Sequence, residues 1–306
     1  MTSWALRASV AGADRIRYER YGFELGGESM RTTSTTTLTF TPLDAPFGAE
    51  VRGLTWDEPS SETVGTITRW LRSKLLLVFR GQDSPTREQL DGFFSHFGRL
   101  QLHTYDGAFH YGTFTDAATE FVQRRDDTNY VVNVEQGAEE LPWHNDQSHR
   151  PQLKVLSVLE ALEVEDDATP TEFRDMYVAY EMLPVDLRAR LAHKQGVFFN
   201  PRQPPPSEQP RLADAMHLVF TPHPHSGRVA LYVNGYTQRI AGFDLVESSR
   251  LLTLLERHAA QHAPRYVHAW RTGDLVVWDN VGLQHRRPRV AAGERRTLRQ
   301  YEGVAE

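Results

Sequence analysis

Short strand-like segments separated by turn signals recur along most of this chain and constrain its fold more than any other feature. Apolar or alternating runs occupy 33–40, 75–79, 130–134, 143–148, 153–162, 196–200, 217–221, 228–233, 266–270, 274–278 and 295–301. Helical spacing is confined to 60–74, 84–97, 175–183, 185–193 and 245–258. Many short strands with few helices predict a mainly β fold, a sandwich or jelly roll with flanking helices.

Nothing in the sequence divides the chain into several folded units. No internal repeat or linker-like stretch is present, so we expect 31–306 to form a single domain. Residues 1–30 contain few periodic apolar positions, and a Thr-rich strand pattern begins only after Met30. We expect the 1–30 segment to be a poorly ordered N-terminal extension, or Met30 to be the true start; a short added helix is the alternative.

Charge and composition exclude several classes of function. The net charge of −6 provides no electrostatic basis for binding nucleic acid or an anionic membrane surface. The chain has no cysteine, so disulfides, thiolate nucleophiles and iron–sulfur clusters are excluded, and any metal must be held by His, Asp or Glu. No apolar run approaches the ~20 residues of a membrane helix, and the N-terminus lacks the apolar core of a signal peptide. We therefore expect a cytoplasmic protein.

His144 and Asp146 are the first candidate metal ligands. Residues two apart in an extended segment point to the same side, so the predicted strand 143–148 presents both on one face. A second histidine from elsewhere would complete the 2-His-1-carboxylate triad that is typical of non-haem Fe(II) oxygenases. His285 is the candidate, because it lies at the far end of the loop that follows the predicted strand 274–278.

An arginine follows the third candidate ligand at a short distance along the chain. Arg296 lies in the predicted strand 295–301, where Arg296, Leu298 and Gln300 share one face.

Together these residues resemble the taurine dioxygenase / chlorophenoxyacetate dioxygenase family of Fe(II)- and 2-oxoglutarate-dependent oxygenases. The resemblance covers about residues 39–301 and rests on Trp143-His144-x-Asp146, Thr171, Tyr177-x-Ala179-Tyr180-Glu181-x-Leu183-Pro184, the segment from His223 to Asn234, Trp278-Asp279-Asn280, His285 and Arg295-Arg296. It implies a double-stranded β-helix, the cupin-like jelly roll.

The resemblance also implies roles for most of the candidate residues. The implied roles are Fe(II) ligation for His144, Asp146 and His285; binding of the cosubstrate 2-oxoglutarate for Arg296 and Thr171; and substrate contact for His103 and Tyr236. From their positions beside the candidate ligands, we expect Asn280 to organise the loop before His285 and Trp278 to pack beside the site. Gln300 shares a strand face with Arg296 and is a further candidate substrate contact, although the family usually has an arginine there. Arg296 would grip the distal carboxylate of 2-oxoglutarate through a bidentate, charge-assisted pair.

The implied reaction uses Fe(II), 2-oxoglutarate and O₂. It couples the oxidative decarboxylation of 2-oxoglutarate, which gives succinate and CO₂, to C–H oxidation of a small organic substrate, most simply hydroxylation. Desaturation, cyclisation and oxidative cleavage use the same cofactors and stay open. A halogenase is disfavoured, because Asp146 occupies the position that a halide needs. Relatives are often dimers or tetramers, so a homo-oligomer is expected.

The alternative from another class is a non-catalytic jelly-roll binding protein. Such a protein is expected to have lost a metal ligand or the cosubstrate arginine, and this chain retains all of them. His223-x-His225 is a competing histidine pair. It lies in a Pro- and Gly-rich turn without a carboxylate at metal spacing, so we interpret it as structural.

The departures from the family pattern lie on the substrate side. Family members that attack sulfonates or carboxylates usually carry a second arginine where this chain has Gln300. Our hypothesis is that this strand does not anchor the substrate as a simple small acid. In addition, 166–171 lacks the usual Gly-Gly-Asp-Thr turn, and 150–154 lacks the usual paired prolines.

Overall fold

The structure of the chain is a computed structural model. The described residues are 38–57, 59–82, 85–96, 121–122, 131–133, 140–199, 215–291 and 294–303. The predicted N-terminal extension 1–30 lies outside these residues.

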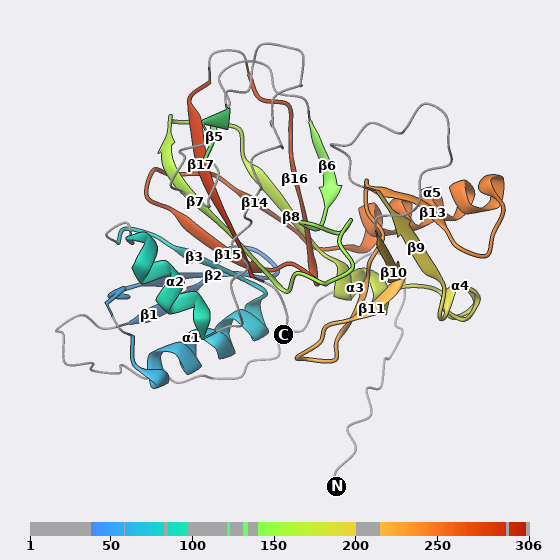
Figure 1. Ribbon diagram of the computed structural model, residues 1–306, viewed down its shortest axis with the longest axis horizontal. Coiled ribbons are helices and arrows are strands. Elements are labelled where there is room, and N and C mark those ends of the chain that lie inside the picture. The colour runs from blue at the N-terminus through green and yellow to red at the C-terminus, as the bar shows by residue number, and fades with distance from the viewer. Residues whose placement is uncertain are drawn as a thin grey trace, which may run out of the picture.

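Two β-sheets form the centre of the molecule (Figure 1). The larger sheet has the order β1-β2-β3-β15-β7-β17-β5-β4. Its strands are β1 (Thr39–Pro42), β2 (Ala49–Arg52), β3 (Leu76–Phe79), β15 (Leu275–Asp279), β7 (Leu156–Val164), β17 (Arg296–Gly303), β5 (Val131–Asn133) and β4 (Phe121–Val122). The smaller sheet has the order β14-β8-β16-β6, with β14 (Arg265–His268), β8 (Thr171–Asp175), β16 (Leu283–Arg287) and β6 (Leu141–His144).

Neighbouring strands in both sheets come from distant parts of the chain. In the larger sheet, β15 lies between β3 and β7, so that Val276 is opposite both Val78 and Leu159. The strand pairs are antiparallel except for β2 and β3, which run parallel. The central strands β3 and β15 are buried along their whole length, which explains their continuous apolar sequences.

The core lies between the two sheets, which contact each other through large aromatic side chains. Phe173 of β8 and Trp278 of β15 are fully buried, and their ring centroids lie 5.4 Å apart in an edge-to-face arrangement. Side chains that point inward from either sheet therefore enter the same apolar interior.

Helices and two small sheets cover the outside of this core. In Figure 1, α1 (Ser61–Lys74) and α2 (Arg87–Ser95) lie beside the β1–β3 end of the larger sheet. The remaining elements are α3 (Met176–Glu181), α4 (Val185–Leu191), α5 (Leu245–His262), the sheet of β10 (Ala215–Leu218), β9 (Gln195–Phe198) and β13 (Thr237–Ile240), and the pair β11 (Phe220–Pro222) and β12 (Val229–Leu231). The predicted mainly β fold with flanking helices is confirmed.

Local capping chemistry explains where the first two helices begin. The Ser60 side chain accepts a hydrogen bond from the Thr63 backbone N–H and caps α1. The second helix was predicted from residue 84 but begins at Arg87. Thr86 and Gln89 exchange side-chain-to-backbone hydrogen bonds, a capping box that fixes this start.

Two predictions about strands near the site were wrong. The predicted strand 143–148 is the strand Leu141–His144 followed by a turn, in which Gln147 has a positive φ of 57°. His285 was predicted to lie at the far end of the loop that follows 274–278, whereas it lies in the middle of β16. Among the described residues, β6 lies at the edge of its sheet, a position in which a strand tolerates a proline such as Pro142.

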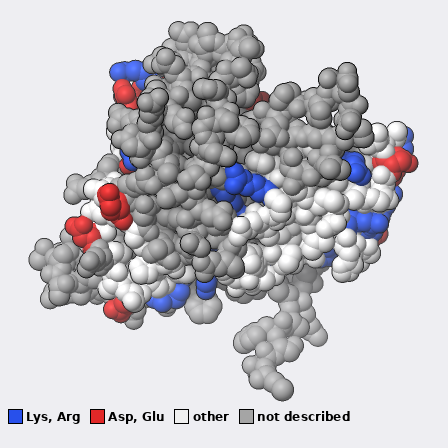
Figure 2. Space-filling model, viewed as in Figure 1, with Lys and Arg blue, Asp and Glu red and all other residues white. Residues whose placement is uncertain are grey.

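The surface of the described part carries charges of both signs. On the face shown in Figure 2, Lys and Arg side chains lie in small separate groups, and so do Asp and Glu. Within the described ranges, no helix is both long enough and apolar enough to cross a membrane.

Candidate active site

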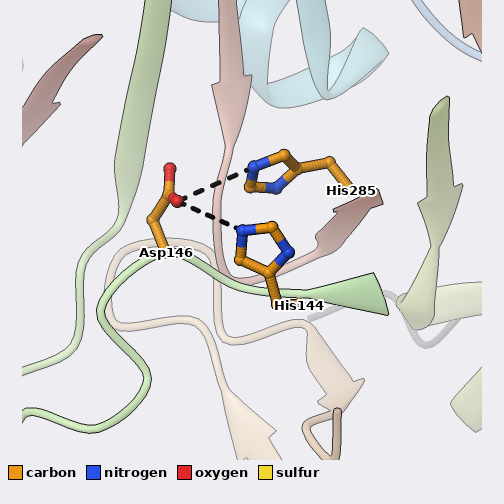
Figure 3. A group of neighbouring side chains, drawn as sticks. All are labelled: His144, Asp146 and His285. Carbon is orange, nitrogen blue, oxygen red and sulfur yellow. Dashed lines mark ion pairs between the residues drawn. The ribbon is translucent and has the colours of Figure 1, made fainter. Parts of the chain in front are cut away.

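Two histidines and an aspartate converge between the sheets (Figure 3). The Oδ1 atom of Asp146 lies 3.6 Å from Nε2 of His144 and 3.7 Å from Nε2 of His285. The three candidate ligand atoms all lie within 4.8 Å of one another. All three side chains are buried, so the cluster faces the interior and not bulk water.

Strand register brings the two histidines together. His285 and His144 are directly opposite each other in the antiparallel pair of β16 and β6, and their ring centroids are 4.1 Å apart. Cross-strand partners have closely spaced Cβ atoms and point to the same face of a sheet. The pairing therefore places two imidazoles side by side, although they are far apart in sequence.

Asp146 reaches the cluster by a different route from the predicted one. It does not lie on the strand with His144 but in the turn after β6. Asn280 holds this turn through two hydrogen bonds: its Oδ1 accepts from the Asp146 backbone N–H at 2.9 Å, and its Nδ2 donates to the Asp146 carbonyl at 3.1 Å. The turn between β15 and β16 thus positions the carboxylate.

The protonation states of the cluster suit a divalent metal ion. Nδ1 of His144 lies 2.8 Å from the carbonyl oxygen of Pro142 and must donate, so Nε2 presents its lone pair toward Asp146. Burial and the neighbouring His144 lower the pKa of His285 to about 3, although Asp146 opposes this shift. Burial disfavours the Asp146 anion, but His285 and His144 outweigh burial and hold the pKa of that carboxyl below its usual value. The donor set is two imidazoles and one carboxylate.

Trp278, the other predicted supporting residue, packs against the cluster. Its ring centroid lies 4.9 Å from that of His285 in an edge-to-face arrangement. Trp278 is fully buried, so it restricts the orientation of the imidazole and excludes water from that side.

Arg296 and Thr171 lie together in a second buried group. Arg296 donates from Nε to the Thr169 carbonyl at 2.9 Å and from Nη2 to Oγ1 of Thr171 at 3.0 Å. Oγ1 of Thr171 also accepts a hydrogen bond from the Trp270 indole N–H at 3.0 Å. Burial and the nearby Arg287 lower the pKa of Arg296 to about 9, which still leaves the guanidinium charged at neutral pH.

The three predicted substrate contacts fall in different places. The ring of Tyr236 lies 5.3 Å from the ring of His144. Gln300 donates from Nε2 to Oδ2 of Asp146 at 2.8 Å, so its side chain contacts a predicted metal ligand. His103 lies outside the described residues.

The sequence interpretation missed two residues that shape this region. Arg287 lies two positions beyond His285 on β16, on the same face, and only 8% of it is exposed. Glu294 accepts hydrogen bonds from the backbone N–H and the hydroxyl of Thr169, and so fixes the carbonyl that Arg296 contacts. Recognising 283–287 as a strand would have placed Arg287 beside the site by alternation.

Comparisons with known proteins place these observations in a family. The family model described as "Taurine catabolism dioxygenase TauD, TfdA family" matches residues 39–301. The chain is 33% identical over 278 residues to an alpha-ketoglutarate-dependent 2,4-dichlorophenoxyacetate dioxygenase of Cupriavidus pinatubonensis, which covers 84% of this chain and 94% of the relative. It is 30% identical over 282 residues to a pentalenolactone F synthase of Streptomyces avermitilis, with coverage of 82% and 89%.

A solved structure agrees with the sequence relatives. The crystal structure of AAD-2 in complex with Mn(II) and N-oxalylglycine has a TM-score of 0.70 and 25% sequence identity, and covers 88% of this chain and 97% of that one.

A buried His–Asp–His cluster between two β-sheets is characteristic of the non-haem iron oxygenases. The chain belongs to the TauD/TfdA family of alpha-ketoglutarate-dependent dioxygenases. It is therefore an oxidoreductase that uses Fe(II), 2-oxoglutarate and O₂. The family, enzyme class and cofactors predicted from the sequence are confirmed.

Proposed function

We propose that His144, Asp146 and His285 hold the catalytic Fe(II). The convergence of two Nε2 atoms and one carboxylate oxygen in a buried site is the observation that carries this assignment. Three protein ligands leave three positions of an octahedral ion open for cosubstrate and O₂. The two facing sheets of antiparallel strands, with the site between them, support the assignment of the domain as a double-stranded β-helix of the jelly-roll type.

Arg296 and Thr171 bind the distal carboxylate of 2-oxoglutarate in this proposal. Arg296 already uses Nε and one N–H of Nη2 within the protein, which leaves Nη1 and the second N–H of Nη2 to face a carboxylate. Oγ1 of Thr171 accepts from both Arg296 and Trp270, so its own proton is free to be donated to the same carboxylate. Arg296 and Thr171 would thus hold the distal carboxylate of 2-oxoglutarate through charge-assisted hydrogen bonds in a buried position.

The proposed reaction is hydroxylation of a small organic substrate. Bound iron, with 2-oxoglutarate and O₂, supplies the oxidising chemistry that removes hydrogen from a substrate carbon. The protein orients the cosubstrate through Arg296, holds the carboxylate ligand through Asn280 and excludes water through the packing of Trp278.

Anaerobic addition of Fe(II) and 2-oxoglutarate tests the assignment directly. The chelate of a keto acid on Fe(II) gives a visible charge-transfer band, which we expect in the wild-type protein and not in His144→Ala. Arg296→Ala should show the band only at much higher 2-oxoglutarate concentrations, because the grip on the distal carboxylate is lost. Absence of the band in the wild-type protein would overturn the proposal.

Succinate release over a substrate panel then identifies the substrate class, with His144→Ala as the control. Relatives of this chain include enzymes named for 2,4-dichlorophenoxyacetate and for pentalenolactone F. Because Gln300 stands where an arginine was expected, the panel should pair each carboxylate or sulfonate with a neutral analogue. We expect the neutral compounds to be accepted at least as well as the acids.

A further inference from the structure

The two oxygens of the Asp146 carboxylate have different partners. Oδ1 faces Nε2 of His144 at 3.6 Å and Nε2 of His285 at 3.7 Å. Oδ2 accepts a hydrogen bond from Nε2 of Gln300 at 2.8 Å. The amide of Gln300 is thus directed at the metal cluster and occupies the oxygen that points away from the histidines.

We propose that Gln300 is a positioning residue that keeps Oδ1 of Asp146 directed toward the two histidines. The inference rests on the proposed function, because it concerns the way in which the proposed ligand set is held. A carboxylate without this partner on its second oxygen is able to rotate and turn Oδ1 away from the histidines. The hydrogen bond from Gln300 opposes that rotation, and so keeps Oδ1 oriented for the metal position.

Asp146 is restrained from two directions. Its backbone is fixed by Asn280, from the turn between β15 and β16, and its side chain is fixed by Gln300, from β17. Both partners are themselves well anchored, because Asn280 directly follows β15 and Gln300 lies within β17, two strands of the larger sheet. The carboxylate is therefore held in place before a metal binds, which reduces the ordering that binding requires.

Strand β17 links this restraint to the cosubstrate site. Arg296, Leu298 and Gln300 alternate along β17 and point to one face, and Arg296 and Leu298 are buried. The same strand therefore carries the proposed grip on 2-oxoglutarate at one end and the restraint on the metal carboxylate at the other. β17 is hydrogen-bonded along its length to β7, from Arg296 opposite Val164 to Gly303 opposite Leu156.

This assignment explains why a neutral amide suits position 300. An amide N–H donates to Oδ2 without adding a positive charge beside the cation that Asp146 is to bind. An ionised carboxylate at the same place would have no proton to donate and would face Asp146 with a like charge. Glutamine satisfies Oδ2 and leaves the charge of the ligand set unchanged.

Titration with Mn(II) alone, followed by the EPR signal of the free ion, measures this role without turnover. Gln300→Met keeps the length of the side chain and removes the donor. We expect its Mn(II) affinity to fall about 10- to 100-fold, which is the range for loss of a partner that orients a metal ligand. Gln195→Met, at an exposed position of β9, is the matched control and should bind Mn(II) as the wild-type protein does.

Two further measurements separate a positioning role from other roles. Gln300→Asn keeps the amide but withdraws it by one methylene, so it should also lose affinity; both variants should unfold at the wild-type temperature in EDTA. Mn(II) affinity within about twofold of wild type in both variants would overturn the inference. A change confined to the substrate KM, with metal affinity retained, would overturn it as well and would make Gln300 a substrate contact.

His144→Ala distinguishes failure of this inference from failure of the proposed function. If His144→Ala loses Mn(II) binding while both Gln300 variants retain it, the metal site stands and only the positioning role is wrong. If His144→Ala binds Mn(II) as tightly as the wild-type protein, the proposed metal site itself is wrong.

Discussion

At the scale of single residues, Gly282 shows how closely the site region is packed. It ends the turn between β15 and β16, where Oδ1 of Asp279 accepts hydrogen bonds from the backbone N–H groups of Val281 and Gly282, both at 2.9 Å. A Cβ added to Gly282 would lie 2.5 Å from Cζ of Tyr177, whose hydroxyl donates to Asp279. The ring and the turn cannot both keep their places if this position carries a side chain.

We predict that Gly282→Ala lowers the free energy of unfolding by about 1–3 kcal/mol, as expected for an overpacked core. Urea unfolding of the metal-free protein measures the effect. Gly65→Ala is the matched control, because a Cβ there meets only an Arg69 guanidinium nitrogen, at 3.7 Å. Since His285 follows in the next strand, Gly282→Ala should also weaken Mn(II) binding. Equal unfolding free energies for Gly282→Ala and the wild-type protein would contradict the prediction.

The residue types of the site could be predicted from the sequence, but their contacts could not. His144, Asp146 and His285 were identified because imidazole and carboxylate are the metal ligands available to a chain without cysteine. The reason given for Asp146 was wrong, since a turn and not strand alternation directs it. Gln300 was expected to face a substrate, and only the structure reveals its bond to Asp146. Such contacts depend on the order of strands in the sheets. The spacing of residues in the sequence does not determine that order.

At the scale of secondary-structure elements, one carboxylate joins three strands. Asp274, immediately before β15, accepts hydrogen bonds from Arg80 after β3: 2.7 Å from Nε and 2.5 Å from Nη2. Its Oδ2 also lies 3.2 Å from Nε2 of His268, at the end of β14 in the other sheet. Asp274 and His268 are buried, so this group fixes the ends of strands from both sheets relative to each other.

We predict that Asp274→Asn destabilises the fold by roughly 2–4 kcal/mol, because it removes the carboxylate that accepts two hydrogen bonds from Arg80 and leaves that guanidinium the longer 3.8 Å contact with Oε2 of Glu50. Denaturant unfolding measures the change. Glu163→Gln is the control: it breaks the 3.3 Å pair with Arg295, in which both side chains are largely exposed, and it should have little effect. If the two substitutions cost the same, the group at Asp274 does not join the sheets as described.

The cap of helix α3 provides a prediction about pH. Oδ1 of Asp175 accepts hydrogen bonds from the backbone N–H groups of Tyr177 and Val178, yet burial raises the pKa of Asp175 to about 6. An unfolded aspartate titrates near pH 3.9. Between these values the folded state binds more protons than the unfolded state, so this group's contribution to stability falls as pH rises from about 4 to about 6.

Asp175→Asn keeps the accepting oxygen and removes the charge. At pH 8 we expect this variant to be more stable than the wild-type protein, by on the order of 2 kcal/mol, and near pH 4 we expect the difference to vanish. Urea unfolding of the metal-free protein at the two pH values measures this. Asp244→Asn, at the exposed cap of α5, is the control for loss of a carboxylate that caps a helix without being buried. A pH-independent effect at Asp175 would contradict the prediction.

Helices and strands whose apolar residues recur at regular spacing could be predicted from the sequence. Strand β16, which carries His285, could not. The helix at 60–74 was predicted by its apolar spacing, and α1 spans Ser61–Lys74. β16 contains Gln284, Arg286 and Arg287, a composition that does not indicate a buried strand. Gln284 is nevertheless fully buried, because its amide accepts from Arg174 and donates to the Val233 carbonyl. Polar residues lie on both faces of this strand, because some belong to the site and others to a hydrogen-bond network. The alternation of apolar and polar residues that usually indicates a strand is therefore missing from its sequence.

At the scale of the whole molecule, the proposed metal site exists only when distant strands have paired. Its ligands come from β6, from the turn after it and from β16, and the pairing of β16 with β8 and β6 completes the smaller sheet. The sequence predicted the mainly β class but not this strand order, because long-range pairing depends on packing between the sheets. An unfolded chain therefore has no preformed site, and metal binding must stabilise the folded state alone.

We predict that metal ions raise the unfolding temperature of the intact protein and that EDTA reverses the effect. With Mn(II) at about 100 times its dissociation constant, binding to the folded state contributes about 2.7 kcal/mol. For a large domain this corresponds to a rise of roughly 5 °C. His144→Ala should unfold at the same temperature with Mn(II) and with EDTA, since one of the three ligands is gone. If Mn(II) raises the unfolding temperature of His144→Ala as much as that of the wild-type protein, the stabilising ion binds elsewhere, and the link between metal binding and pairing of the site strands is wrong.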